Sequence, residues 1–117
     1  MKTSRNEPIK EIPGYDGRYW AYEGGVILTT VDGELVPLKT SRNEKGYLVV
    51  YFSWNSKTVK KKVHRIIGEL FVPGRTRLKN EVEHRDRDRA NAAAYNLEWV
   101  TRAENMRRMW EARRANV

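Results

Sequence analysis

The sequence contains no cysteine, which excludes disulfide bonds and cysteine-bound zinc sites. Any metal ion must therefore be held by oxygen or nitrogen ligands. No apolar run reaches the roughly 18 residues of a membrane span, and the polar start of the chain, Met1 to Glu7, lacks the apolar stretch of a signal peptide. These absences predict a soluble intracellular protein with no membrane partner. A length of 117 residues fits one ordinary domain, or one small catalytic unit with an extension.

Basic side chains outnumber acidic ones by 23 to 15, which gives a formal net charge of +8. Taken alone, such an excess would suit either an anionic polymer or a membrane surface as the partner, and charge does not choose between them. The excess is uneven, because residues 1–80 hold 15 basic and 8 acidic side chains whereas residues 81–117 hold 8 and 7. The first part suits contacts with phosphates, and the second has carboxylates available for a cation.

Turn-forming residues divide the first half of the chain into short segments. Asp32-Gly33 and Asn55-Ser56 each separate two runs of β-branched, aromatic or alternating residues, which is a hairpin signal. We therefore expect short antiparallel strands in this region. The expected strands are 19–22, 26–30, 35–38, 46–52 and 58–63.

A helix is expected at residues 63–71, because apolar side chains recur there at helical spacing and Pro73-Gly74 follows. After it we expect a basic loop, a strand at 81–84, a polar loop and a returning strand at 97–100. The order strand, loop, strand, helix can bring polar side chains from each element to one metal ion.

The last helix is expected to begin near Thr101, because Thr101 and Glu104 fit a capping box. Met106, Met109 and Trp110 fall on one stripe of that helix. A stripe of this kind is typical of a helix face that packs into a core.

Three polar residues at fixed spacing carry a family resemblance. His84 is followed by Asn96 twelve residues later and by Asn105 twenty-one residues later, within Asn-Leu-Glu-Trp-Val-Thr and Glu-Asn-Met blocks. This segment resembles the ββα-metal (His-Me) finger of HNH (His-Asn-His) endonucleases of the phage homing type. Upstream, residues 11–17 with 46–50 resemble the modular N-terminal motif that often precedes such fingers, and residues 63–67 resemble the helix just before the finger.

The resemblance implies an α+β fold in two parts. Residues 1–62 would form an antiparallel β region that contacts DNA. Residues 63–117 would hold one helix, the ββα-metal finger and the C-terminal helix. The resemblance covers roughly residues 9–110, although the family's loop usually has an Asp-Gly-Asn turn where this chain has Asp86-Arg87-Asp88.

Hydrolysis of a phosphodiester needs an activated water and a cation that neutralises developing charge. His84 suits the general base, since an unperturbed histidine pKa is about 6.5. Oxygens of Glu83 and Asn105 suit a hard cation, Mg2+ or alternatively Mn2+ or another divalent ion. Neighbours on a regular strand face opposite ways, so Glu83 and His84 share one site only if the strand end bends.

The other polar residues of the segment are expected to have structural roles. Asn96, the middle residue of the motif, would tie the loop to the strands and so fix His84 in the catalytic site. His64 is expected to be a satisfied helix histidine, with contact to the DNA backbone as the alternative. Asp86 and Asp88 alternate with arginines, which indicates local charge pairing.

Basic residues before and after the finger are the expected phosphate contacts. For the lysines near residue 60 the alternative is a solvated strand whose charges protect a sheet edge. The expected DNA-binding residues are Lys60, Lys61, Lys62, Arg65, Arg75, Arg77, Lys79, Arg107 and Arg108.

The sequence thus predicts a metal-dependent DNA endonuclease that acts on double-stranded DNA as a monomer or homodimer, in the cytoplasm of a phage-infected bacterial host. Nicking and double-strand cutting both stay open. One alternative is a DNA-binding protein that keeps the finger without catalysis. Another is a structured-RNA-binding protein, suggested by aromatic residues spaced along the expected strands. Those aromatics are Tyr19, Trp20, Tyr22, Tyr51 and Trp54.

Overall fold

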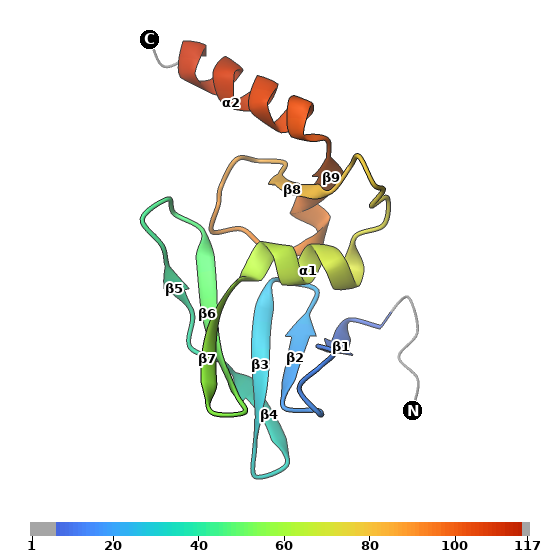
Figure 1. Cartoon of the computed structure of the whole chain (residues 1–117), viewed down its shortest axis with the longest axis vertical. Coiled ribbons are helices and arrows are strands. Elements are labelled where there is room, and N and C mark those ends of the chain that lie inside the picture. The colour runs from blue at the N-terminus through green and yellow to red at the C-terminus, as the bar shows by residue number, and fades with distance from the viewer. Residues whose placement is uncertain (1–6, 116–117) are drawn as a thin grey trace.

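The computed structural model of the chain describes residues 7–115, so nearly all of the polar start Met1 to Glu7 lies outside the described residues. Helix α1 crosses the middle of the molecule, with two sheets on one side of it and the β8–β9 hairpin and helix α2 on the other (Figure 1). The elements are β1 (Ile9–Glu11), β2 (Tyr19–Tyr22), β3 (Val26–Val31), β4 (Glu34–Pro37), β5 (Ser41–Arg42), β6 (Leu48–Trp54), β7 (Lys57–Lys62), α1 (Val63–Phe71), β8 (Glu81–His84), a 3-10 turn η1 (Ala94–Asn96), β9 (Leu97–Val100) and α2 (Arg102–Ala115).

The strands form three antiparallel sheets in the orders β1-β2-β3-β4, β5-β6-β7 and β8-β9. Both predicted hairpins are confirmed. Asp32 and Gly33 have φ of 51° and 80°, and Asn55 and Ser56 have φ of 50° and 61°. Two consecutive positive φ values are the geometry of the two-residue turns whose twist matches paired strands. Strands β1 and β5 were not predicted, and each has only two or three residues.

The core lies where α1 meets the first two sheets and the start of β9. Ile27 of β3, Phe52 of β6, Ile67 of α1 and Leu97 of β9 are all nearly or fully buried within one cluster. Helix α1 has the bounds that its apolar spacing predicts, and Val63, Ile66 and Ile67 of that spacing are buried, together with His64 and Gly68. Because α1 contacts β2 and β6 of the first two sheets and also β8 and β9, it fixes the β8–β9 hairpin relative to the N-terminal sheets.

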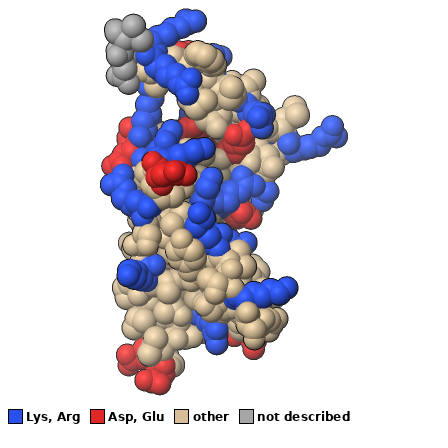
Figure 2. Space-filling model, turned by 60° about the vertical axis from the view of Figure 1, so that its left-hand side comes forward, with Lys and Arg blue, Asp and Glu red and all other residues tan. Residues whose placement is uncertain are grey.

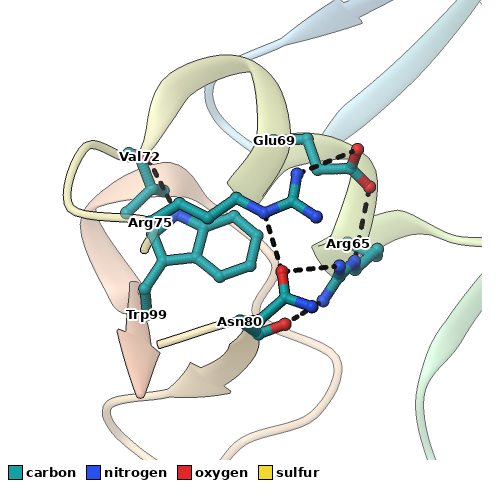
Figure 3. Close-up of polar contacts among 6 residues, drawn as sticks. All are labelled: Arg65, Glu69, Val72, Arg75, Asn80 and Trp99. Atoms are coloured by element: carbon teal, nitrogen blue, oxygen red, sulfur yellow. Dashed lines mark hydrogen bonds and ion pairs between the residues drawn. The ribbon is translucent and has the colours of Figure 1, made fainter. Parts of the chain in front are cut away.

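Trp99 of β9 ties the hairpin to the segment that follows α1. Its Nε1 donates a hydrogen bond to the carbonyl oxygen of Val72 at 2.9 Å. The guanidinium groups of Arg65 and Arg75 lie 5.1 and 5.0 Å from the centroid of the indole ring, within cation–π range (Figure 3). One buried aromatic therefore holds together α1, the loop after it and β9.

Helix α1 and strand β8 approach closely at Gly68. A Cβ atom at this position would lie 2.8 Å from Cγ2 of Val82 and 3.3 Å from its Cγ1. We expect Gly68→Ala to lower the free energy of unfolding by about 1–2 kcal/mol, since overpacking outweighs the better helix propensity of alanine. Urea unfolding measures the change. In a Val82→Ala background the same substitution should be neutral or stabilising, and an equal cost in both backgrounds would contradict this contact.

Helix α2 begins as predicted but packs differently. The Thr101 hydroxyl accepts a bond from the Glu104 backbone N–H at 3.0 Å, and Glu104 accepts one from the Thr101 N–H at 3.3 Å, so the capping box is confirmed. The predicted core stripe is wrong, because Met106, Met109 and Trp110 are 43%, 40% and 55% exposed. The helix leaves the hairpin after its first turns (Figure 1), so no described element covers the stripe. Neither helix of the described chain is long and apolar enough to cross a membrane.

Candidate active site

His84 ends strand β8 and is buried, with 2% of its surface exposed. It pairs with the buried Leu97 of β9, which anchors the strand end in the core. Its Nε2 atom is shielded from solvent and has no hydrogen-bond partner among residues 7–115. Since His84 nevertheless lines a surface cleft of about 750 Å³, Nδ1 is the ring nitrogen left to face that cleft.

Glu83 and Asn105 line the same cleft as His84. Neighbours on a regular strand face opposite ways, but Glu83 and His84 lie at the end of β8, where the chain turns. The backbone N–H of Arg87 donates to the carbonyl oxygen of His84 at 3.2 Å, and Arg87 has a φ of 64°. Oε1 of Glu83 accepts a bond from the backbone N–H of His84 at 3.2 Å, so its carboxylate folds toward the strand end. The structure therefore brings these three predicted residues together.

Asn105 lies in the first turn of α2, just behind the capping box. Its side-chain Nδ2 donates to Oε1 of Glu81 at 2.8 Å, which orients the amide and leaves Oδ1 as the atom able to ligate a cation. In residues 7–115 no group of three or more histidines and carboxylates is placed to hold an ion. An ion bound by Glu83 and Asn105 would take its other ligands from water and phosphate. Mg2+ accepts such coordination, so the donor chemistry fits it.

Asn96 joins the loop after β8 to the start of β9. Its Oδ1 accepts from the backbone N–H of Asp86 at 3.1 Å. Its Nδ2 donates to Oδ1 of Asp86 and to the carbonyl oxygen of Asn91, each at 2.9 Å. Its own carbonyl oxygen accepts from the N–H of Arg85 at 2.6 Å. These four bonds hold the backbone immediately after His84.

The predicted charge pairing of Asp86 and Asp88 with neighbouring arginines is wrong, since neither carboxylate forms an ion pair within the described chain. The Asp86 carboxylate accepts bonds from Asn91 and from the backbone N–H of Asp88, and these bonds lower its pKa. Short acidic side chains bond readily to the backbone two residues ahead, which alternation in sequence does not reveal. Arg85 instead pairs with Glu98 across the hairpin at 3.3 Å.

Two aromatic rings that the prediction did not assign to the site pack beside His84. The rings of Tyr47 and His64 stack with centroids 4.9 Å apart, and the His64 ring lies 4.8 Å from that of His84. His64 is 8% exposed, and its Nδ1 lacks a hydrogen-bond partner in the described structure. The expectation of a satisfied helix histidine is therefore wrong. Its position beside Arg65 gave no sign of burial, and nothing in the strand pattern around Tyr47 marked that residue.

Burial changes the protonation of both histidines. Burial, followed by the charges of His84, Lys62 and Arg65, lowers the pKa of His64 to about 3. The pKa of His84 is also lowered by burial, although the nearby Asp86 carboxylate acts in the opposite direction. Both rings are therefore neutral near pH 7, and a neutral imidazole can accept a proton.

Basic side chains gather over the middle and upper parts of the face that Figure 2 shows, while the lower end carries few of them. Four exposed lysines lie on β7, which is an edge strand. Arg77 and Lys79 are exposed in the loop before β8. Arg107 is exposed on α2, where its Nε lies 4.0 Å from Glu111. The lysines of β7 are Lys57, Lys60, Lys61 and Lys62.

Three of the arginines expected to bind DNA are engaged within the protein. Arg65 donates to the carbonyl oxygen of Asn80 at 2.6 Å, and Arg75 donates to Oδ1 of Asn80 at 2.8 Å (Figure 3). Both guanidinium groups also pair with Glu69, at 3.3 and 3.6 Å. Arg108 pairs with Glu98 beside the cleft, which raises the pKa of Arg108. These charges hold the loop and hairpin in place.

Comparison with known proteins gives consistent matches. Residues 61–107 match a family described as HNH endonuclease. The chain is 31% identical to the H-N-H endonuclease F-TflI of Escherichia phage T5 over 107 residues, which is 86% of this chain and 50% of that protein. It is 32% identical to an uncharacterized HNH endonuclease of Acanthamoeba polyphaga mimivirus over 108 residues, which is 89% of this chain and 26% of that protein. The chain thus spans half or less of these relatives.

A solved structure is also similar to this one. It is described as DNA binding and cleavage by the HNH homing endonuclease I-HmuI, with a TM-score of 0.78 and 27% identity. The similarity covers 89% of this chain and 58% of that chain. It therefore includes the N-terminal sheets as well as the segment that matches the family, and both chains share one small α+β arrangement.

Proposed function

We propose that this chain, whose residues 61–107 match the HNH endonuclease family, is a metal-dependent DNA endonuclease of the homing type. The observation that carries the proposal is the convergence of His84, Glu83 and Asn105 on one cleft. Together they offer a buried base next to two oxygen donors, which is the minimum that phosphodiester hydrolysis requires. The similar structure is named as one that binds and cleaves DNA.

In the proposed reaction, Nδ1 of His84 accepts a proton from the attacking water. The lowered pKa of His84 keeps the ring mainly neutral near pH 7, the state in which an imidazole can accept a proton. The bonds of Asn96 to the following loop hold His84 at the strand end while the proton moves. Asn96 thus acts as a positioning residue.

Glu83 and Oδ1 of Asn105 would hold a divalent cation, Mg2+ or Mn2+, which neutralises charge on the scissile phosphate and the leaving oxygen when bound. Glu81 orients the Asn105 amide for this task through its bond to Nδ2. Arg87 and Arg89 line the same cleft and would attract the DNA strand toward it.

Double-stranded DNA would lie across the basic face of the protein, which would act as a monomer or a homodimer. We assign phosphate contact chiefly to the exposed lysines of β7 and to Arg77, Lys79 and Arg107. Arg65, Arg75 and Arg108 would contribute mainly by holding the scaffold, because their guanidinium groups already have protein partners. The phage relative suggests action in an infected bacterial cell.

Supercoiled plasmid tests the proposal. We expect purified protein to convert it to open circles, or to linear DNA if both strands are cut, with Mg2+ or Mn2+, and to leave it intact with EDTA. Conversion that persists in EDTA would exclude the metal-dependent mechanism. An intact plasmid under every condition, together with a gel shift of duplex DNA, would favour the non-catalytic DNA-binding alternative. Stronger binding to structured RNA at matched salt would favour the RNA-binding one.

A further inference from the structure

We propose that His64 is a positioning residue, whose Nδ1 accepts a hydrogen bond from Nε2–H of His84 and so fixes the tautomer of His84. The inference rests on the proposed function in one respect, namely that His84 is the base. The bond itself concerns only the two imidazole rings.

The observation behind the proposal is a pair of unpartnered atoms. Across residues 7–115, just two buried side-chain nitrogen or oxygen atoms lack a hydrogen-bond partner, and they are His64 Nδ1 and His84 Nε2. They belong to neighbouring rings, whose centroids are 4.8 Å apart and whose planes are inclined by 49°. Rings at this separation are close enough for edge nitrogen atoms that face each other to meet at hydrogen-bond distance.

The two atoms have complementary chemistry. A neutral imidazole carries one N–H donor and one bare nitrogen acceptor. If His84 is to accept a proton at the Nδ1 that faces the cleft, its own proton must sit on the buried Nε2. His64 Nδ1 then supplies the acceptor that this N–H lacks, and a single bond satisfies both unpartnered atoms.

The surroundings of His64 keep it an acceptor. Lys62 and Arg65 lie on either side of it in sequence, and burial with these charges holds its pKa at about 3, so the ring stays neutral. A neutral ring that accepts at Nδ1 carries its proton on Nε2, and His64 lines a basic groove together with Glu81 and Asn105. The stacked ring of Tyr47 limits tilting of His64.

The bond would serve both stages of proton transfer. Before the reaction it excludes the tautomer whose proton occupies Nδ1, in which His84 cannot act as a base. After the reaction the imidazolium has N–H groups at both nitrogens, and the buried one keeps its acceptor. A partner that holds the catalytic histidine in the correct tautomer is a general device in hydrolases, most familiar with a carboxylate in that place.

Two substitutions separate the acceptor from the shape of the ring. In His64→Asn the amide oxygen can occupy the place of Nδ1, so the acceptor is kept. In His64→Phe the ring and its stacking on Tyr47 are kept, but the acceptor is lost. If His64→Phe does not fold, His64→Gln replaces it, because its amide extends to the place of Nε2 and leaves that of Nδ1 empty.

The first readout is the tautomer of His84, measured by NMR of protein with ¹⁵N-labelled histidine at about pH 8, where unperturbed histidine is neutral. We expect the Nε2–H form in the wild type and in His64→Asn, and a mixture with the Nδ1–H form in His64→Phe. A wild-type His84 in the Nδ1–H form, or an unchanged Nε2–H form in His64→Phe, would overturn the proposal. This readout needs no DNA, so it stands even if the chain does not cleave.

The second readout is single-turnover cleavage of DNA with Mg2+ at saturating protein. We expect His64→Phe to cut about 10–100-fold more slowly at unchanged affinity, a part of what general base catalysis supplies, with His64→Asn recovering most of the rate. A loss of affinity without loss of rate would mean that His64 contacts DNA, which would contradict the positioning role.

Discussion

Replacement of His84 by alanine is expected to slow DNA cleavage by about 10²–10⁴-fold, the usual contribution of a general base. The protein should still bind DNA, because His84 is buried and the basic side chains of β7 and the following loop are unchanged. Single-turnover rates on a labelled duplex, together with a gel-shift affinity, separate the two effects. A larger Kd with an unchanged rate would argue that His84 supports DNA binding and is not the base.

The control for this prediction must address the cavity left by a buried ring. His84→Asn keeps more of the side-chain volume and should be as inactive as His84→Ala, since an amide does not accept a proton near neutral pH. Tyr95→Ala removes a large side chain that is 78% exposed and does not line the cleft, so it should cleave at the wild-type rate. Circular dichroism and thermal unfolding show whether each variant is folded. A His84 variant that is folded and cleaves within a few-fold of wild type would rule out His84 as the base.

Local chemistry made much of the fold predictable. The Asp32-Gly33 and Asn55-Ser56 turns specify hairpins through backbone angles that few other residues accept readily. The Thr101–Glu104 capping box specifies where α2 begins, because both partners of its hydrogen bonds lie within one turn. In each case the information is contained in a few neighbouring residues, and no knowledge of the rest of the fold is needed.

Features that depend on distant contacts were not predictable in the same way. The stripe of Met106, Met109 and Trp110 correctly marks one face of a helix, but periodicity does not say whether another element covers that face. His64 is the opposite case, because a residue that the sequence does not mark as buried lies in the interior. Its neighbours in sequence are charged, yet α1 turns its ring inward against Tyr47 and His84, residues 17 and 20 positions away.

The candidate site combines both kinds of information. Spacing brought His84, Asn96 and Asn105 into one motif, and the structure places the first and third on one cleft with Asn96 behind them. Net charge, in contrast, could not tell which basic residues are available to DNA. Arg65 and Arg75 count toward the excess, but Trp99, Glu69 and Asn80 hold them in a scaffold (Figure 3).

Acidification is expected to destabilise the folded protein strongly, because His64 must stay neutral to remain buried. The unfolded chain protonates this histidine below about pH 6.5, whereas the folded chain protonates it only near pH 3. Between these values the unfolded state binds one more proton, so the free energy of unfolding falls by about 1.4 kcal/mol per pH unit as the pH decreases. From about pH 6.5 to pH 4 the loss approaches 3 kcal/mol, a large part of the stability of a small domain.

Urea unfolding at a series of pH values measures this loss. The lowered pKa of His84 acts in the same direction. The lowered pKa values of Asp86 and Glu104 begin to add to the loss at about pH 5, where the unfolded carboxylates start to bind protons, so the interval above about pH 5 isolates the histidines from these two groups. His64→Asn has no group that titrates there, and it should retain only the slope due to His84. If instead its stability fell with pH as steeply as that of the wild type, the neutral buried state of His64 would not be the cause, and the acid sensitivity would belong to His84 and the carboxylates.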